Sequence, residues 1–258
     1  MITPGGITVI ALGGLPEIAQ GADLASLLIA AAERCSCALR DDDVLVVAQK
    51  IVSKAEGRRV RLGDVTPSPR AAEIAAATGK DPRFVELVLR ESRAVLRVGR
   101  DVIVVEDARG IVLANAGIDQ SNVGGADTAA LLLPSDPDAS AAALRTAIGV
   151  HGNTTVAVII ADSLGRAWRL GTLGHAIGAA GLPALVDLRG RSDRHGRTLR
   201  HTEIALADGL AAAGVLVMGE ADEGRPAAVI RGFSGLRAGG RAEGATRLQR
   251  PLEEDLFR

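Results

Sequence analysis

Short runs of consecutive hydrophobic residues recur along the chain, and most are bounded by glycine, proline or charged residues. Runs of this length with such boundaries are typical of buried β-strands. The strands predicted in this way are residues 7–12, 44–48, 94–98, 102–106, 156–161 and 227–231.

Between these runs, hydrophobic residues follow helical spacing. Asp23 can cap one such stretch, and Asp81-Pro82 opens another, because proline is tolerated at the first helical position and aspartate caps it. The stretch around Gly178 and Gly181 is rich in leucine, alanine and isoleucine, and we interpret it as a tightly packed helix. The other predicted helices are residues 24–39, 81–92, 136–149 and 203–213.

Helices and strands alternate, but the two predicted strands in the middle of the chain look like hairpins. Hairpins argue against a simple doubly wound sheet. The predicted fold is therefore α+β, with a two-lobed architecture of mixed sheet and helices. We expect a two-lobed domain at residues 1–235 and a C-terminal tail at residues 236–258. The glycine- and arginine-rich residues 235–247 are expected to be mobile, and residues 251–258 look able to dock.

Composition excludes several classes of protein. Hydrophobic residues make up 47% of the 258 residues, enough for a core, and no run is long enough to span a membrane. A formal net charge of −1 and an aromatic content of 2% argue against a nucleic-acid partner. No basic region precedes the first hydrophobic run, so we expect no signal peptide and a cytoplasmic protein. Cys35 and Cys37 lie two apart in a predicted helix, and we interpret them as packing residues.

Two acidic loops follow hydrophobic runs. Asp162 and Ser163 end a predicted strand, and Asp119 and Asn122 follow a shorter apolar run. A carboxylate at the end of a buried strand is costly unless a cation lies opposite it. Hard divalent cations such as Mg²⁺ prefer carboxylate, hydroxyl and amide oxygens. The alternative is that both aspartates only cap turns or helices, but together the two loops favour a metal-phosphate site.

Residues 49–57 follow a predicted strand and are expected to begin a helical turn, an arrangement that suits an anion. Lys50 and Lys54 are four residues apart and would share one helical face, although an ordinary solvated lysine face fits the pattern too. The glycines at 13 and 14 could bring backbone close to a ligand. No P-loop motif occurs, so a P-loop nucleoside triphosphatase is excluded.

Basic residues are frequent in the stretch that follows Asp162 and Ser163. Arginine binds phosphate and carboxylate in a bidentate manner, so this cluster suggests an anionic substrate next to the metal, although about half of the side chains are expected to face water. The cluster comprises Arg166, Arg169, His175, Arg189, Arg191, Arg194, His195, Arg197 and His201.

These motifs together resemble one family. From about residue 5 to residue 235 the chain is similar to the coenzyme F420-0:L-glutamate ligases, also called F420 gamma-glutamyl ligases. The matching stretches are residues 14–18, 51–57, 115–123, 162–169, 219–224 and 229–232.

The resemblance implies an enzyme that joins L-glutamate to a deazaflavin cofactor precursor through a gamma-linked amide, in coenzyme F420 biosynthesis. It implies GTP as co-substrate, Mg²⁺ or Mn²⁺ at two sites and an intertwined homodimer; K⁺ is a third candidate ion. It implies an acyl phosphate formed from GTP, without a protein nucleophile. From the residues alone, ATP in place of GTP, a metal-dependent phosphohydrolase and a non-catalytic nucleotide-binding regulator stay open.

The resemblance also implies which residues form the site. Asp119 and Asp162 would hold one metal, and Ser163 and Glu220 a second. Gln49 stands where Ser or Thr is usual, Ser163 where Thr is common and Glu220 where Gln is frequent, and each keeps an oxygen or hydrogen-bonding group. The residues implied to bind GTP are Leu15, Pro16, Glu17, Ile18, Gln49, Lys54, Asn122, Met218, Gly219, Ala221, Asp222, Glu223, Gly224 and Arg225.

Overall fold

A five-stranded sheet forms the centre of the molecule. The computed structural model describes residues 6–120, 128–233 and 243–255. The order of the strands is β1-β12-β2-β8-β9, in which β2 and β8 are parallel and the other neighbours antiparallel. The strands are β1 (Thr8–Leu12), β2 (Val44–Ala48), β8 (Ala157–Arg166), β9 (Arg169–Ala180) and β12 (Ala227–Arg231).

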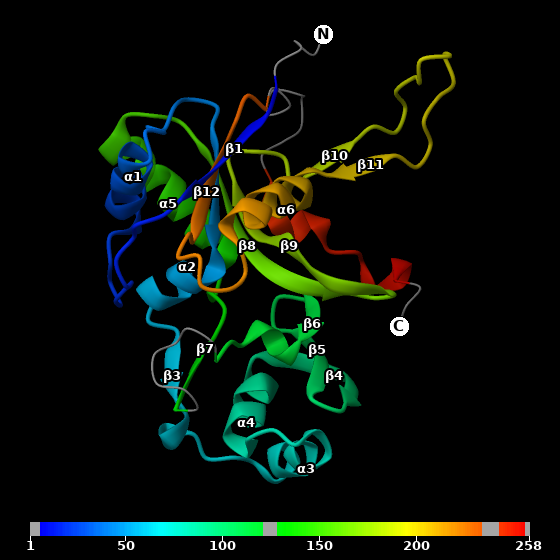
Figure 1. Ribbon diagram of the computed structural model, residues 1–258. Coiled ribbons are helices and arrows are strands. Elements are labelled where there is room, and N and C mark those ends of the chain that lie inside the picture. The colour runs from blue at the N-terminus through cyan, green and yellow to red at the C-terminus, as the bar shows by residue number, and fades with distance from the viewer. Residues whose placement is uncertain (1–5, 121–127, 234–242, 256–258) are drawn as a thin grey trace.

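Helices cover both faces of this sheet (Figure 1). Successive side chains of a strand point to opposite faces, so β2 contributes Leu45 and Val47 to one hydrophobic cluster and Val44 and Val46 to the other. The first cluster packs under α1 (Leu24–Arg34) and α5 (Pro137–Gly152), and the second under α6 (Leu206–Met218). All four β2 side chains are fully buried, which explains why the strand is a continuous hydrophobic run.

After the short helix α2 (Gln49–Ala55) the chain leaves the central sheet. The described residues of the range 59–131 are called the inserted segment below; they lie under the sheet in Figure 1 and have a hydrophobic cluster of their own. Ile103 and Val105 of one strand are fully buried there among side chains of the two helices. The elements of the segment are β3 (Arg59–Arg61), α3 (Pro69–Thr78), α4 (Pro82–Arg90), β4 (Ser92–Gly99), β5 (Val102–Asp107), β6 (Val112–Ala114) and β7 (Ala129–Leu131), with the 3₁₀ turns Leu62–Asp64 and Asn115–Gly117.

A second excursion forms an arm. Strands β10 (Leu185–Asp187) and β11 (Glu203–Ala205) pair with each other, and residues 188–202 between them project from the body of the molecule (Figure 1). The side chains along this part are mostly exposed.

The mixed α+β prediction is confirmed, but one predicted helix is wrong. The stretch containing Gly178 lies in strand β9. A Cβ atom on Gly178 would lie 2.2 Å from the carbonyl oxygen of Pro137, and one on Gly174 would lie 2.7 Å from Val215. The glycines therefore allow α5 and α6 to approach opposite faces of a strand, and this close packing has the same sequence pattern as a tightly packed helix.

Several predicted boundaries also change. Helix α1 ends at Arg34, so Cys35 caps it and Cys37 lies beyond it; both still pack in the core, as interpreted. Strand β8 continues through Asp162 to Arg166 instead of ending at the aspartate. Helix α6 begins at Leu206 because residues 203–205 pair with β10.

The C-terminal region is only partly as expected. Most of the stretch expected to be mobile lies outside the described residues, which leave out residues 234–242. Ala245, however, is 4% exposed and belongs to the hydrophobic cluster under α6. The Asp138 carboxylate accepts hydrogen bonds from the backbone of Ala245 and Thr246. Residues 252–254 form an exposed 3₁₀ turn. Among the described residues, no helix has both the length and the apolar character that crossing a membrane requires.

Candidate functional site

A cavity of about 720 Å³ opens where the central sheet meets its connecting loops. Four stretches of chain line it: residues 15–18, 48–54, 161–163 and 215–226. Every described residue of the sequence-predicted site lies among them, with the single exception of Asp119. Asn122 lies outside the described residues.

The loop that follows β1 forms one wall. Gly14 adopts a left-handed conformation with φ of 73°, which glycine tolerates. Its carbonyl oxygen accepts a hydrogen bond of 3.0 Å from the Arg34 guanidinium at the end of α1. The helix therefore holds the loop that carries residues 15–18 toward the cavity.

Helix α2 supplies the polar floor. It begins directly where β2 ends, so its first residue, Gln49, is buried beside the sheet at 2% exposure. The Ser53 hydroxyl donates to Gln49 Oε1 over 2.9 Å, which orients the amide. Lys54, five residues after Gln49, reaches out of the floor, and its Nζ lies 2.6 Å from the Glu17 carboxylate.

Asp162 lies in the middle of β8, not at its end. The parallel pairing of β2 with β8 stops at Ala161, so Asp162 is the first residue beyond that pairing, while the pairing with β9 continues. Burial raises the pKa of Asp162 to about 7. The charges of Asp119 and Glu220 also raise this pKa, whereas the Ser163 amide and Lys50 lower it. The carboxylate is therefore desolvated and close to two others, which is the environment in which a cation is most strongly attracted.

The adjacent residue points toward the opposite wall. The Ser163 hydroxyl donates to Glu220 Oε1 over 2.6 Å. Glu220 lies in the loop after α6, where Gly219 has a φ of 82° and packs against the Glu223 carboxylate. Glu223 also accepts a hydrogen bond from the Ala221 amide, so the loop at residues 219–223 closes on itself.

Asp119 reaches the site from the inserted segment. Its carboxylate lies 2.6 Å from Lys50 Nζ, and Lys50 lines the cavity. The backbone of Asp119 exchanges two hydrogen bonds with Leu131 of β7, of 3.0 and 2.8 Å. This short bridge fixes where the carboxylate lies.

The predicted metal ligands fit a hard cation in chemistry, since all four offer oxygen. Burial, which raises the pKa of Asp162, also makes a cation opposite this carboxylate favourable. Within the described residues, however, no three His, Cys, Asp or Glu side chains converge on one point. The structure thus brings the predicted ligands to one region in two pairs, Asp162 near Asp119 and Ser163 bonded to Glu220.

Comparison with known proteins identifies the family. The model of the F420-0:gamma-glutamyl ligase family matches residues 14–232. The chain belongs to this family. It is 47% identical to the coenzyme F420:L-glutamate ligase of Methanothermobacter thermautotrophicus over 98% of this chain and 99% of that protein. It is 46% identical to the ligase of the same name from Methanopyrus kandleri, over 86% and 90% of the two chains. For the Haloarcula marismortui protein the identity is 45% over 97% and 95%.

Not every predicted feature of this family member reaches the cavity. None of the nine residues in the basic cluster lines it. Arg189 pairs instead with Asp187 and Glu203, and Arg191, Arg194 and Arg197 are exposed on the projecting arm (Figure 1). The expectation that this cluster lies next to the metal ligands is wrong for the arm, because the strands β10 and β11 carry it away from β8.

Some lining residues were not assigned to the site. Val215 lies on α6, and Ala48 and Ala161 are the last residues of the β2–β8 pairing. Small and apolar side chains of this kind carry no chemical signal in a sequence. Lys50 does carry such a signal, because it lies four residues before Lys54 and would share its helical face. Lys50 is also the residue that links Asp119 to the cavity.

Proposed function

We propose that this chain ligates L-glutamate to coenzyme F420-0 through a gamma-linked amide bond, with GTP as the phosphate donor. The observation that carries the proposal is the single cavity, which gathers the loop 15–18, helix α2, Asp162 and the loop after α6 in a member of this ligase family. Curated relatives that align along almost the whole chain are named coenzyme F420:L-glutamate ligases.

In the proposed reaction, a carboxylate oxygen of the acceptor attacks the terminal phosphorus of GTP, and GDP leaves. The product is an acyl phosphate at the terminal carboxylate of the acceptor. The amine nitrogen of glutamate then attacks the acyl carbon, the carbon–oxygen bond to phosphate breaks, and inorganic phosphate and one proton are released. Phosphoryl transfer needs mainly positioning and neutralisation of charge, so no protein nucleophile is required.

The residues of the cavity divide this work. The loop 15–18, Gln49 and the loop at 218–225 surround the nucleotide, and Lys54 faces its phosphates. Asp119 and Asp162 would hold one Mg²⁺ or Mn²⁺, and Ser163 and Glu220 a second. These ions would supply neutralisation of the charge on the phosphates. Lys50, beside Asp119, adds a fixed positive charge at the same place.

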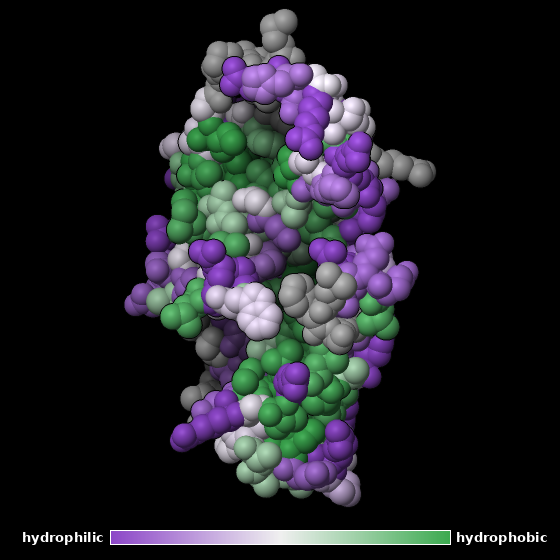
Figure 2. Space-filling model, turned by 90° about the vertical axis from the view of Figure 1, so that its right-hand side faces the viewer, coloured by the Kyte–Doolittle hydropathy of each residue, from purple (hydrophilic) through white to green (hydrophobic). Residues whose placement is uncertain are grey.

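We also propose that the molecule is two-lobed and forms an intertwined homodimer. The separate hydrophobic cluster of the inserted segment supports the two lobes. Figure 2 shows hydrophobic residues over much of the lower half of the face it presents, where the inserted segment lies. Val98 and Val112 are each 44% exposed, and Trp168 and Leu170 at the turn between β8 and β9 are 86% and 99% exposed. Exposed apolar surface of this kind is typical of protein interfaces where its residues gather in one patch.

Residues 94–114, which include the hairpin-like strands, are candidates for the exchange between subunits, but only part of their surface is available. Ile103 and Val105 are buried against α4 in the same chain, so one face of β5 is already covered. The interface would therefore use the other face and the edges. Light scattering tests the dimer: an active species near the chain mass of 26.5 kDa would contradict it and leave the ligase activity untouched.

The activity is tested by the dependence of phosphate release on glutamate. A ligase releases phosphate from GTP only when both acceptor and glutamate are present, and mass spectrometry then finds the acceptor heavier by glutamate residues. A phosphohydrolase would release phosphate without glutamate, and a nucleotide-binding regulator would release none. Replacing GTP by ATP in the same assay tests the choice of nucleotide.

A further inference from the structure

The inserted segment is joined to the central sheet by two connectors that lie side by side. The chain enters through Arg58, and leaves through residues 132–134. The Arg58 amide donates to the Ser53 carbonyl at the end of α2 over 2.9 Å, and the Leu132 amide donates to the Arg58 carbonyl over 3.1 Å. The backbone of Arg58 therefore bridges α2 and the second connector.

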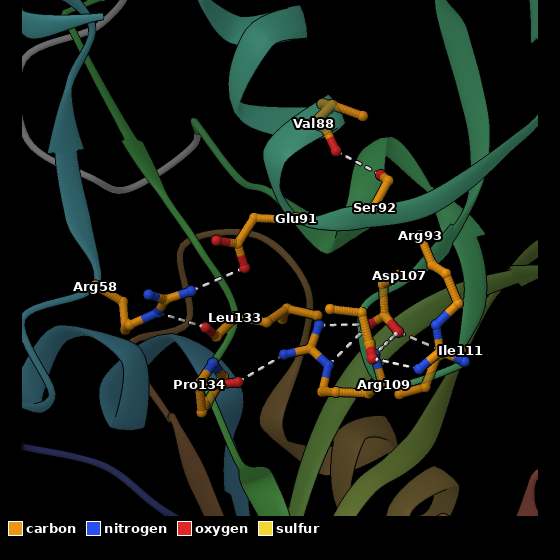
Figure 3. A network of polar contacts seen from close by, with 11 residues as sticks. Arg58, Val88, Glu91, Ser92, Arg93, Asp107, Arg109, Ile111, Leu133 and Pro134 are labelled. Atoms are coloured by element: carbon orange, nitrogen blue, oxygen red, sulfur yellow. Dashed lines mark hydrogen bonds and ion pairs between the residues drawn. The ribbon is translucent and has the colours of Figure 1, made fainter.

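The Arg58 side chain contacts the second connector as well. Its Nε donates to the Leu133 carbonyl over 2.9 Å, and its terminal nitrogen donates to the Glu91 carboxylate over 2.8 Å (Figure 3). Glu91 caps the end of α4 in the inserted segment. Both side chains are largely shielded, at 24% and 23% exposure, so this pair is screened less than a surface pair. The planar guanidinium can bind both partners at once, which an ammonium group cannot do in the same geometry.

Arg58 bonds to the residues that directly follow strand β7, and Asp119 is bonded to the last residue of that strand. Asp119 exchanges backbone hydrogen bonds with Leu131, and the next two residues bond to Arg58. On the other side, α2 ends three residues before Arg58 and carries Lys50, whose Nζ lies 2.6 Å from Asp119. Arg58 therefore ties together the two elements whose separation determines where Asp119 lies in the site.

A second arginine holds the same connector from below. Arg109 donates to the Pro134 carbonyl over 2.6 Å and pairs with Asp107, a carboxylate with no exposed side-chain surface (Figure 3). Asp107 also accepts from the amides of Arg109 and Ile111. This contact anchors the connector to the inserted segment, but the side-chain hydrogen bonds of Arg109 to other described residues reach neither β7 nor α2. Arg58 is the arginine placed to position Asp119.

We propose that Arg58 is a positioning residue for the metal site, acting through the second connector and β7 on Asp119. The inference rests on the proposed function, because it takes Asp119 to be a metal ligand. Groups that orient a metal ligand without touching the metal commonly change metal affinity about 10- to 100-fold when removed. The loss of Arg58 leaves the Asp119 carboxylate in place chemically and changes only where it is held.

The test is a direct titration of Mn²⁺ into the protein without nucleotide or acceptor, by calorimetry or by the electron paramagnetic resonance signal of free Mn²⁺. Arg58→Met keeps the apolar stem and removes both hydrogen bonds, and we expect Mn²⁺ binding at least about tenfold weaker. Arg58→Lys keeps the charge but can satisfy one acceptor, so its affinity should fall between Arg58→Met and the unchanged chain. Asp119→Asn provides the benchmark for loss of the ligand itself.

Arg83→Met is the matched control. Arg83 pairs with Asp81 at the start of α4, in the same inserted segment but away from both connectors. Its removal should leave Mn²⁺ binding unchanged. Equal weakening by Arg83→Met would show a general loosening of the segment and overturn the positioning role. So would unchanged binding in a folded Arg58→Met protein.

If Arg58→Met does not fold, Glu91→Gln replaces it, because the amide keeps a hydrogen-bond acceptor and loses only the charge. We expect a smaller but measurable weakening of Mn²⁺ binding, and wild-type affinity in this variant would overturn the inference. Failure of the proposed function looks different. A chain that binds Mn²⁺ in an Arg58-dependent manner but adds no glutamate refutes the ligase alone, whereas glutamate ligation with Mn²⁺ binding indifferent to Arg58 refutes the positioning role alone.

Discussion

The central sheet and the inserted segment contribute to the site in unequal ways. Among the residues that the structure describes, all those that line the cavity belong to the central sheet and its connecting loops, and none belongs to the inserted segment. The inserted segment nevertheless has a full hydrophobic cluster of its own and brings a single carboxylate, Asp119, to Lys50 at the edge of the cavity. The described part of the inserted segment thus contributes to the site through a carboxylate that contacts Lys50, and not through the walls of the cavity.

The two aspartates show what this difference means. Asp162 follows directly on Ile160 and Ala161, which are 0% and 2% exposed, so packing on both faces of the sheet determines its place. Asp119 depends on a two-bond bridge to Leu131 and on the connectors beyond it. Close-packed interiors resist displacement, whereas an element held by a few hydrogen bonds can shift as a unit. One half of the site is therefore held by the core of the central sheet, and the other by the inserted segment and its connectors.

The largest effect is expected from removing either carboxylate. Asp119→Asn and Asp162→Asn should each lower the rate of glutamate ligation at least about a hundredfold, because a charge contact to metal-held phosphate is lost. Both proteins should fold, since each change removes a charge from a crowded group of carboxylates. Asp64→Asn, an exposed change in the inserted segment, is the control. Full activity of Asp119→Asn alone would remove the inserted segment from the chemistry.

The central sheet and the inserted segment should also differ in how well they tolerate an added methyl group. Gly178→Ala places a Cβ 2.2 Å from a backbone oxygen of α5, where neither partner can yield easily. We expect a loss of about 1–3 kcal/mol in the free energy of unfolding, as overpacking produces. Gly63→Ala in the inserted segment meets nothing within 4 Å and should be close to neutral. Chemical denaturation measures both, and equal effects would contradict the packing described for β9.

A smaller effect is expected at Lys54. If it faces a phosphate of the nucleotide, Lys54→Ala should raise the KM for GTP about tenfold, which corresponds to one charge-assisted hydrogen bond. The KM for glutamate should hardly change. Glu17→Gln is the matched control, because it breaks the pair with Lys54 and keeps the lysine. If the two constants move together, or neither moves, Lys54 is only a surface partner of Glu17.

The sequence predicted those parts of the site that belong to continuous strands and their first turns. The runs at 44–48 and 227–231 are strands because their side chains are buried on both faces, which leaves an unmistakable pattern. Asp23 and Asp81 cap helices as predicted, since capping is a local property. That the loops at residues 15–18 and 218–225 lie at one site was implied by the family resemblance and not by any local signal in the sequence.

The sequence could not predict features that depend on distant partners. Glycines in β9 reflect the approach of α5 and α6, which no local pattern reveals. Strands β3 and β7 have three residues each and exist because they pair across about seventy positions of the chain. The role of Arg58 likewise depends on Glu91 and Leu133, which are distant in sequence.

The last expected effect is a change in how stability depends on pH. The pKa of Asp162 is about 7 in the folded protein against a usual value of 3.8, so the folded state holds its proton more tightly than the unfolded state. Stability of the metal-free protein should therefore fall as pH rises from about 4 to about 7, and stay at the lower level above that range. The Asp162→Asn side chain has no carboxyl group to titrate, so the melting temperature of this variant should fall less over the same pH interval. Asp64→Asn should follow the unchanged chain, and melting curves of the Asp162 variant that parallel it would show that the central sheet does not desolvate this carboxylate.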